Sequence, residues 1–540
     1  MTRGGPCNTC SIAGTRARSC CCPREDSTLT LAQLLERAAL RRPDADAVVD
    51  GVVRLSYAEL HARALTLGAA LARLGVAPGD RVLIALKNRW EHVCAHWALQ
   101  AIGGVAVPVN HRFAPAEMAY VLGDSGARVV LFERATAAAV LESARGPSTR
   151  LIYADADPPT DAVAFSELLE PVASPPRAPA ENDLSLILYT SGTTGRPKGV
   201  PRTHENHVAG ALAHALQCGY EWGERTLGVM PLYHTMGIHS LTSMAAINGA
   251  FVCQRDWSAA GALALIARER LSALYLIPTL FYDLVHAPEL GRTDVTTVRK
   301  LAYAGAPMLA PLTDACVKAF SPDVFVNHYG STEIYTFSIR PDVHLKPGCA
   351  GRPGLHSTLR VVTASTERRV GPDEVVAAGN KGEIIARVDS DEAFAGYWNR
   401  PDADARALRD GWYFTGDMGY LDGDGELYVS GRVDDMIISG GENIHPVEVE
   451  EVLARLAGVR DVAIVGEPDA RWGERVVAFI VAPGAGLTAE GVDRYCRESP
   501  DLASFKRPRR VVFVESIPKT ASGKILRRIL RDGEYREITP

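Results

Sequence analysis

Short apolar segments alternate with segments of helical periodicity over much of this 540-residue chain. The alternation extends from about residue 29 to 132 and resumes from Leu184 to about Tyr329. Between these regions, the Pro-, Asp- and Ala-rich stretch 154–183 predicts a loop or a connection between subdomains. Parallel strands need crossover connections, which helices usually provide, and these helices cover both faces of the sheet. The pattern therefore predicts an α/β fold with a large N-terminal domain of βαβ layers.

The sequence changes character after about residue 345. Gly- and Asp-rich segments such as 381–387 and 423–429 predict antiparallel strands and turns in a small β-rich subdomain. From Pro446 onward, helical segments and three apolar strands predict a compact α+β module. We therefore expect three parts: a disordered leader at 1–27, an N-terminal domain at 28–432 and a C-terminal domain at 433–540.

Composition excludes several classes of protein. Lys+Arg 58 against Asp+Glu 64 gives a net charge of −6, so nucleic acid is not an expected partner. The chain contains no apolar run of about eighteen residues, so no membrane span is expected. A hydrophobic content of 47% with 23% charged residues is typical of a globular, multi-domain enzyme.

The cysteines are unevenly placed. Five of the 11 lie in the first 22 residues, and the other six lie in apolar segments. The leader contains arginines but no apolar stretch typical of a signal peptide, so a disulfide framework is not expected and the predicted location is cytoplasmic. Cys7 and Cys10 have the spacing of a zinc knuckle, but no second pair follows closely, and a disordered tail is the favoured interpretation.

The most informative motif is a loop that leaves an apolar strand. Residues 186–199 read LILYTSGTTGRPKG, with four Ser and Thr side chains, three glycines and one lysine. Glycines let backbone amides approach anionic oxygens, hydroxyls donate hydrogen bonds, and the lysine supplies positive charge. The loop therefore indicates phosphate binding, although its spacing differs from that of a Walker A motif.

This loop and six further motifs resemble those of the acyl-adenylate-forming (AMP-binding) superfamily, which includes acyl- and aryl-CoA ligases, luciferases and peptide-synthetase adenylation domains. Aryl-CoA ligases such as 4-chlorobenzoate-CoA ligase are the most similar group. The motifs follow one another in the family's order: 189–199 (YTSGTTGRPKG), 303–307 (YAGAP), 329–333 (YGSTE), 411–417 (GWYFTGD), 431–435 (GRVDD), 439–443 (SGGEN) and 518–524 (PKTASGK).

The resemblance implies a reaction in two halves. A carboxylate attacks the α-phosphate of Mg-ATP to give an acyl-adenylate and pyrophosphate, and a thiol, here CoA, then displaces AMP. The implied catalytic residues are Lys524, Glu333 and His234, with Glu333 as the Mg²⁺ ligand. The implied ATP-binding residues are Thr190, Ser191, Gly192, Thr193, Thr194, Gly195, Lys198, Gly305, Ala306, Pro307, Tyr329, Gly330, Ser331, Thr332, Asp417 and Arg432.

The same resemblance assigns the second half-reaction to a mobile C-terminal domain. Asp434 falls at the family's hinge, about which the small domain rotates after adenylation. The implied CoA-binding residues are Gly440, Gly441, Trp472, Phe505, Arg507 and Arg509. Because Gly440 and Gly441 have no side chains, they are expected to leave a passage for the slim pantetheine arm of CoA. An aromatic face with arginines suits an adenine that carries phosphates.

The acid pocket is the least constrained part of the site. The positions that line the aryl pocket of halobenzoate-CoA ligases hold His234, Thr235, Met236, Ala304, His328 and Thr336. Because Met236 and His328 are bulky and His328 and Thr336 are polar, a benzoate-, hydroxybenzoate- or furoate-like acid is expected, in a role in aromatic acid catabolism. His234 could instead be a packed, hydrogen-bonded histidine at the pocket floor.

Two alternatives stay open for the function. The first is a medium-chain fatty acyl-CoA ligase, since pockets with a histidine like His234 occur there too. The second is a stand-alone adenylation enzyme that loads a carrier protein, although the chain has no carrier domain and lacks the early Asp of amino-acid-specific adenylation modules. The sequence leaves the oligomeric state open, with a homodimer as the alternative to a monomer.

Overall fold

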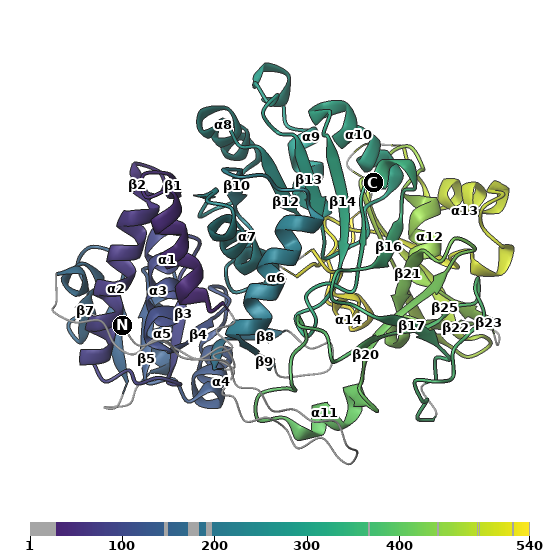
Figure 1. The fold of residues 1–540 in the computed structure, drawn as a ribbon. Helices are drawn as coiled ribbons and strands as arrows, with labels where there is room; N and C mark the ends of the chain where they lie inside the picture. The colour runs from purple at the N-terminus through teal and green to yellow at the C-terminus, as the bar shows by residue number, and fades with distance from the viewer. Residues whose placement is uncertain are drawn as a thin grey trace, which may run out of the picture.

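The computed structural model describes residues 29–144, 149–170, 183–190, 197–365, 368–439, 442–482, 484, 486–520 and 523–538. The predicted leader at 1–27 lies outside these residues. Figure 1 shows a large α/β body that contains the first two-thirds of the chain, with the C-terminal segments gathered at one side.

The first sheet has seven strands in the order β7-β6-β5-β3-β4-β8-β9. All neighbours are parallel except β8 and β9, which form an antiparallel pair. Its strands are β3 (Arg81–Ala85), β4 (Val105–Pro108), β5 (Val129–Phe132), β6 (Arg150–Tyr153), β7 (Ala162–Ala164), β8 (Leu184–Thr190) and β9 (Lys198–Thr203). The loop expected at 154–183 was wrong in part, because it contains β7 and the short helix η1 (Phe165–Leu169).

The second sheet has fourteen strands, in the order β17-β18-β20-β21-β16-β15-β14-β13-β12-β10-β11-β1-β2 with β19 paired to β20. One half is parallel and contains β1 (Asp46–Asp50), β10 (Arg225–Gly228), β11 (Ala250–Cys253), β12 (Ala273–Leu276), β13 (Lys300–Tyr303) and β14 (Val324–Tyr329), with β2 (Val53–Ser56) antiparallel at the edge. The other half is antiparallel, as expected after residue 345. It contains β15 (Ser338–Arg340), β16 (Cys349–Pro353), β17 (Leu359–Val362), β18 (Gly382–Arg387), β19 (Leu408–Arg409), β20 (Trp412–Leu421) and β21 (Leu427–Arg432).

Helices form layers on both sides of each sheet (Figure 1). The layer between the sheets contains α1 (Leu31–Arg41), α2 (Tyr57–Arg73), α3 (Trp90–Ile102), α6 (His204–Gln217) and α7 (Thr235–Ala246). The outer layers contain α4 (Pro115–Ser125) and α5 (Ala137–Ser143) on the first sheet, and α8 (Ala259–Glu269), α9 (Pro278–Val285) and α10 (Ala310–Phe320) on the second. Strand β3 has the expected alternation, since Val82 and Ile84 face the inner core while Leu83 and Ala85 face the outer one.

The C-terminal residues form a smaller α+β unit with its own core (Figure 1). Its sheet has the order β23-β22-β25-β24 with β26 paired to β25. The strands are β22 (Ile437–Ser439), β23 (Glu442–Ile444), β24 (Asp461–Asp469), β25 (Gly473–Val481) and β26 (Arg510–Phe513), and the helices are α12 (Pro446–Leu453), α13 (Ala489–Glu498) and α14 (Arg527–Arg531). The last strand of the large sheet in the chain ends at Arg432, and this sheet begins at Ile437.

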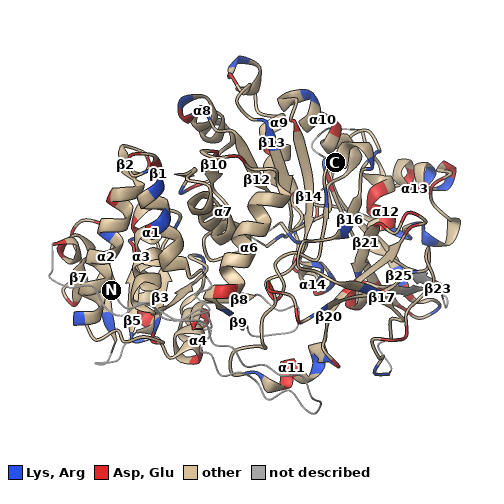
Figure 2. Ribbon diagram, viewed as in Figure 1, with Lys and Arg blue, Asp and Glu red and all other residues tan. Residues whose placement is uncertain are grey.

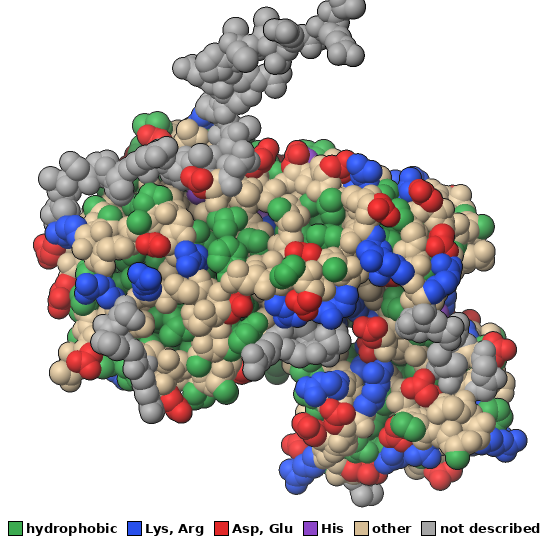
Figure 3. All heavy atoms as spheres, turned by 90° about the horizontal axis from the view of Figure 1, so that it is seen from below, with side chains coloured by type: hydrophobic (Ala, Val, Ile, Leu, Met, Phe, Trp, Pro, Cys, Tyr) green, Lys and Arg blue, Asp and Glu red, His purple; other side chains and the backbone are tan. Residues whose placement is uncertain are grey.

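Charged residues lie mostly near the ends of the helices and strands (Figure 2). On the face shown in Figure 3, acidic and basic side chains are interspersed and no broad basic surface forms. Among the described residues, no helix is both long and apolar enough to cross a bilayer. The six described cysteines are all free and buried.

Candidate active site

Two parallel strands bring the central motifs together. Strands β13 and β14 are parallel neighbours, so the segments that follow them, 304–307 and 330–333, leave from the same edge of the sheet. Gly330 has no room for a side chain, because a Cβ atom there would lie 1.7 Å from the carbonyl oxygen of Tyr335. Gly305 adopts a left-handed backbone, with φ of +84°. Ala306 is half-buried and Pro307 is exposed.

The ends of the phosphate loop are held by strand pairing. Thr190 ends β8 and lies opposite Lys198, which begins β9. The Lys198 ammonium lies 4.1 Å from the centre of the Tyr397 ring, and burial lowers its pKa while Glu333 opposes that shift. The remaining predicted loop residues, Ser191, Gly192, Thr193, Thr194 and Gly195, lie outside the described residues.

Glu333 is buried and partly fixed by two neighbours. Its Oε1 accepts a hydrogen bond of 2.7 Å from the Tyr397 hydroxyl, and its amide donates to Ser331 Oγ at 3.1 Å. Thr332 lies beside the acid pocket, since the hydroxyl of Thr235 donates to that of Thr332 at 3.3 Å. Tyr397 was not predicted as a site residue, and its local sequence gives no signal for this role.

Asp417 lies at the centre of a second hydrogen-bond network. Strands β20 and β21 place it opposite Arg432. Its Oδ1 accepts a bond of 2.6 Å from Arg432 Nη1, and its Oδ2 accepts one of 2.7 Å from the Tyr329 hydroxyl. The carboxylate is therefore fixed from both sides, and each oxygen retains a lone pair for a further donor.

Lys524 comes from the C-terminal unit and lies close to this network. Burial lowers its pKa, Arg432 adds to the shift, and Asp417 and Asp435 oppose it. The preceding Gly523 packs against the large body, because an added Cβ atom would lie 3.1 Å from the Ile277 side chain. The structure therefore brings Lys524 close to Asp417 and Arg432.

The predicted acid-pocket residues lie around the start of α7 and the end of β14. Met236, Ala304, His328 and Thr336 are buried. His328 is hydrogen-bonded on both sides, with Nδ1 2.8 Å from the Tyr275 hydroxyl and Nε2 3.1 Å from the Thr336 hydroxyl. Burial lowers the pKa of His328 to about 4, so its ring is neutral at pH 7.

His234 differs from His328 in its surroundings. It is the residue before α7, and its Nδ1 is buried with no hydrogen-bond partner among the described residues. Burial lowers its pKa to about 4. A neutral imidazole has one donor and one acceptor nitrogen, so His234 Nδ1 is suited to form a hydrogen bond with a polar ligand atom.

Four of the predicted CoA-binding residues lie next to the ends of strands in the C-terminal unit. Trp472 lies at the turn between β24 and β25 and is 40% exposed, while Phe505, 41% exposed, lies in the short helix η5 (Ser504–Lys506) before β26. Arg509 is exposed, and its amide donates to the carbonyl of Val476 on β25 at 2.8 Å. Arg507 pairs with Asp493 at 2.9 Å.

The segments that flank the predicted passage for the pantetheine arm are also described. Ser439 and Glu442 face each other across β22 and β23, and Ser439 also pairs with Gly473, which follows Trp472. Gly440 and Gly441 themselves lie outside the described residues. Asp434, the predicted hinge, is exposed in the short helix η4 (Val433–Asp435) between β21 and β22.

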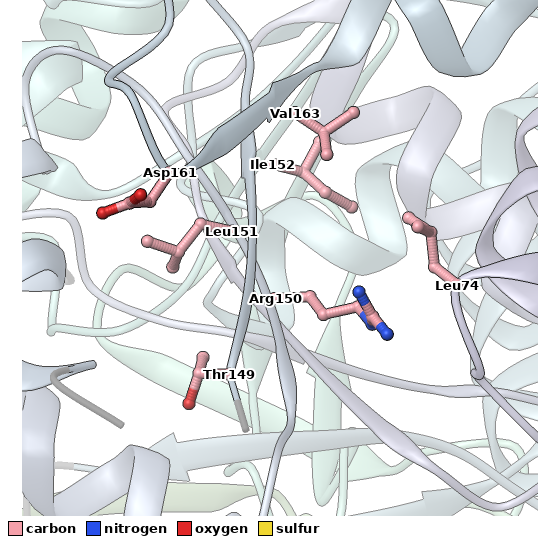
Figure 4. Close-up of a pocket in the computed structure, with 7 residues that line it drawn as sticks. All are labelled: Leu74, Thr149, Arg150, Leu151, Ile152, Asp161 and Val163. Carbon is pink, nitrogen blue, oxygen red and sulfur yellow. The ribbon is translucent and has the colours of Figure 1, made fainter. Parts of the chain in front are cut away.

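A cavity of about 250 Å³ lies elsewhere, at the outer edge of the seven-stranded sheet (Figure 4). Leu74, Arg150, Asp161 and Val163 are among its lining residues. None of the predicted site residues lines it, so it is separate from the site described above.

Family models match both parts of the chain. The AMP-binding enzyme model matches residues 35–398, and the AMP-binding enzyme C-terminal domain model matches residues 448–524. The long-chain-fatty-acid–CoA ligase FadD13 of Mycobacterium tuberculosis is 34% identical over 501 residues, covering 90% of this chain and 94% of that protein. The 4-chlorobenzoate–CoA ligase of an Arthrobacter species is 33% identical over 515 residues, covering 93% and 95%.

The fold is also that of solved relatives. O-succinylbenzoate coenzyme A synthetase (MenE) from Bacillus subtilis, solved with ATP and a magnesium ion, has a TM-score of 0.79 and 29% identity, covering 92% of this chain and 99% of that one. The fold and site together define an AMP-forming acyl- or aryl-CoA synthetase. The chain belongs to the AMP-binding enzyme family, which confirms the resemblance and the fold class expected from the sequence.

Proposed function

We propose that the protein ligates a small aromatic or heteroaromatic carboxylate, of the benzoate, hydroxybenzoate or furoate type, to CoA and releases AMP and pyrophosphate. The observation that carries the proposal is the convergence of Lys198, Glu333, Asp417 and Lys524 around Arg432, next to the buried residues that would bind the acid. Charge stabilisation around phosphates is the main requirement of such a reaction, and these groups supply it.

The ATP-binding roles follow from where the polar groups lie. Thr190 and Lys198, with the loop between them, would hold the β- and γ-phosphates. The segment 305–307 and Tyr329 would flank adenine, and Asp417 would accept hydrogen bonds from the ribose hydroxyls. Thr332 would contact the α-phosphate, and Lys524 would bridge that phosphate and the attacking carboxylate.

The residues present fit a magnesium ion. Mg²⁺ prefers oxygen ligands and is bound in such sites by one or two carboxylates together with substrate phosphates. Glu333 offers a carboxylate whose Oε1 is already oriented by Tyr397. When bound, the ion would neutralise phosphate charge, and the role of Glu333 is to hold it next to the phosphate loop.

The C-terminal unit would carry the second half-reaction. Trp472 and Phe505 offer exposed aromatic faces next to Arg507 and Arg509, which suits a phosphorylated adenine. Rotation about Asp434 would move Lys524 out of the active site and bring the passage at Gly440 and Gly441 to it. The division into domains at 432/433 and a role in aromatic acid catabolism belong to the same proposal.

The decisive test is the exchange of labelled pyrophosphate into ATP with benzoate, hydroxybenzoates, furoate and octanoate, in the absence of CoA. We expect exchange that depends on the acid, because the phosphate-binding residues and Lys524 suffice for adenylation. Exchange that requires CoA, or release of ADP, would contradict the two-step mechanism.

A medium-chain fatty acyl-CoA ligase is the second candidate, favoured by the similarity to the fatty-acid ligase FadD13. A carrier-protein-loading enzyme is a third. Preference for octanoate over every aryl acid would reject the aryl proposal, and transfer to a carrier protein but not to CoA would favour the third.

Pocket size gives a further prediction. Met236 is buried on α7, so Met236→Val should enlarge the pocket and shift preference toward para-substituted benzoates. Each methylene-sized misfit should cost about 1–3 kcal/mol in kcat/KM. The measurement is the ratio of kcat/KM for 4-chlorobenzoate to that for benzoate, with Met308→Val, a buried methionine outside the predicted pocket, as the control. An unaltered ratio would show that Met236 does not line the acid pocket.

A further inference from the structure

A group of buried polar side chains lies behind the predicted acid pocket and is not used in the roles above. Tyr335 stacks on His239, with ring centres 3.6 Å apart, and its hydroxyl lies 2.9 Å from His214 Nδ1. The His239 ring lies 5.2 Å from that of His207. His239 can pack here because Gly210 on α6 has no side chain, since a Cβ atom would lie 2.4 Å from the imidazole.

Arg202 and Glu392 lie beside these rings. Arg202 Nη1 donates at 2.9 Å to the carbonyl oxygen of Glu333, which also accepts from the amide of Phe394 at 2.9 Å. The guanidinium is thus next to the segment that carries Glu392. On the other side, Ser185 Oγ lies 3.1 Å from the Arg202 carbonyl and 3.4 Å from His207 Nδ1.

Several polar atoms of this group are buried without a partner. Arg202 is 3% exposed and Glu392 is fully buried. Arg202 Nη2, His207 Nε2, His214 Nε2 and His239 Nδ1 have no hydrogen-bond partner among the described residues, and the Glu392 carboxylate has none there other than Thr336. Burial of an unpaired charge is costly, and most buried polar atoms in native proteins are hydrogen-bonded. The cluster therefore requires a polar partner.

The group is continuous with the acid pocket. Thr336, which hydrogen-bonds to the pocket residue His328, lies near Glu392 and opposes the rise in the pKa of Glu392 that burial causes. The rings of Tyr335 and His328 lie 4.6 Å apart. His328, Thr336 and Tyr335 thus connect these atoms to the predicted acid pocket through direct contacts.

We propose that Arg202 and Glu392, with His207 and His239 beside them, form a subsite for a hydroxyl group on the acid. This inference rests on the proposed acid-CoA ligase function and names the substrate class. A hydroxyl oxygen accepts from Arg202 Nη2 while its hydrogen is donated to Glu392. A hydroxyl group suits the pair because it both accepts and donates, whereas a halogen or methyl group would leave Arg202 Nη2 without a partner.

The test compares acids that differ only in this group. AMP formation is measured with each monohydroxybenzoate against the benzoate that carries fluorine or methyl at the same position, and with 8-hydroxyoctanoate against octanoate. At least one hydroxy acid should exceed its matched acids by about 10- to 100-fold in kcat/KM, because a site built to bind a hydroxyl rejects analogues that lack it.

Variants assign this preference to the subsite. Glu392→Gln and Arg202→Met should each reduce the ratio of hydroxy to matched acid at least tenfold. Glu269→Gln should leave the ratio unchanged, because Glu269 is also buried but already paired with Arg54 and Arg225. The melting temperature of each variant shows whether it folds. The ratio of hydroxy to matched acid in the wild-type protein tests the proposal even if a variant does not fold.

The outcomes separate the two proposals. Acid-dependent AMP formation with hydroxy and matched acids used equally would overturn the hydroxyl subsite and leave the ligase function standing. A wild-type preference that Glu392→Gln and Arg202→Met both retain would also overturn the subsite. No AMP formation with any acid would overturn both.

Discussion

Lys524→Ala should lose acyl-adenylate formation by about 10³-fold and still convert a supplied acyl-adenylate to its CoA thioester. Lys524 reaches the site from the C-terminal unit and lies near Asp417 and Arg432. In the proposed mechanism its charge stabilises the transition state in which the carboxylate attacks the α-phosphate. The second half-reaction has no such requirement, so the two rates should separate.

The two half-reactions are measured separately, by pyrophosphate exchange and by thioester formation from synthetic benzoyl-adenylate. Lys519→Ala is the matched control, because Lys519 lies five residues earlier and pairs with Asp461 within the C-terminal unit at 2.6 Å. It should leave both rates near the wild-type values. Equal loss of both half-reactions in Lys524→Ala would contradict a role confined to adenylation and would favour a structural one.

Local patterns predicted the elements well. Ser56 and Glu59 predict a capping box, and both of its hydrogen bonds are present at the start of α2. Pro446 begins α12 as expected of a proline at the first helical position. Each of these signals depends on residues that are close together in the sequence, so it can be recognised without the structure. Strand β7 was missed because its three residues are too short to give a period.

The site was predictable only where the resemblance supplied motifs. Glu333 and Asp417 lie in such motifs, but the hydroxyls that fix them, from Tyr397 and Tyr329, reach them across the fold. Arg202 and Glu392 lie 190 residues apart in the sequence, so no spacing rule relates them. Their proximity follows from tertiary packing, in which the Glu333 carbonyl accepts from both segments.

Asp417→Asn should lower kcat/KM for ATP by about 10²–10³-fold. The carboxylate accepts from Arg432 and Tyr329 at its two oxygens, and in the proposed complex from the ribose hydroxyls as well. An amide replaces one oxygen by an NH₂ group that must face a donor, so the variant loses charge-assisted bonds worth about 1.5–3 kcal/mol each. Asp422→Asn, at the turn of the same hairpin and paired with Lys346, should leave the KM for ATP unchanged.

Deoxynucleotides separate ribose binding from a general loss of structure. In the wild-type protein, 2′-deoxy-ATP and 3′-deoxy-ATP should each be used about tenfold less well than ATP, as expected for one lost hydrogen bond. If Asp417 accepts from these hydroxyls, the penalty should largely disappear in Asp417→Asn, because the change in the protein and the change in the ligand remove the same interaction. A penalty that the variant retains in full would show that the ribose is bound elsewhere and that Asp417 serves to hold Arg432 and Tyr329 in place.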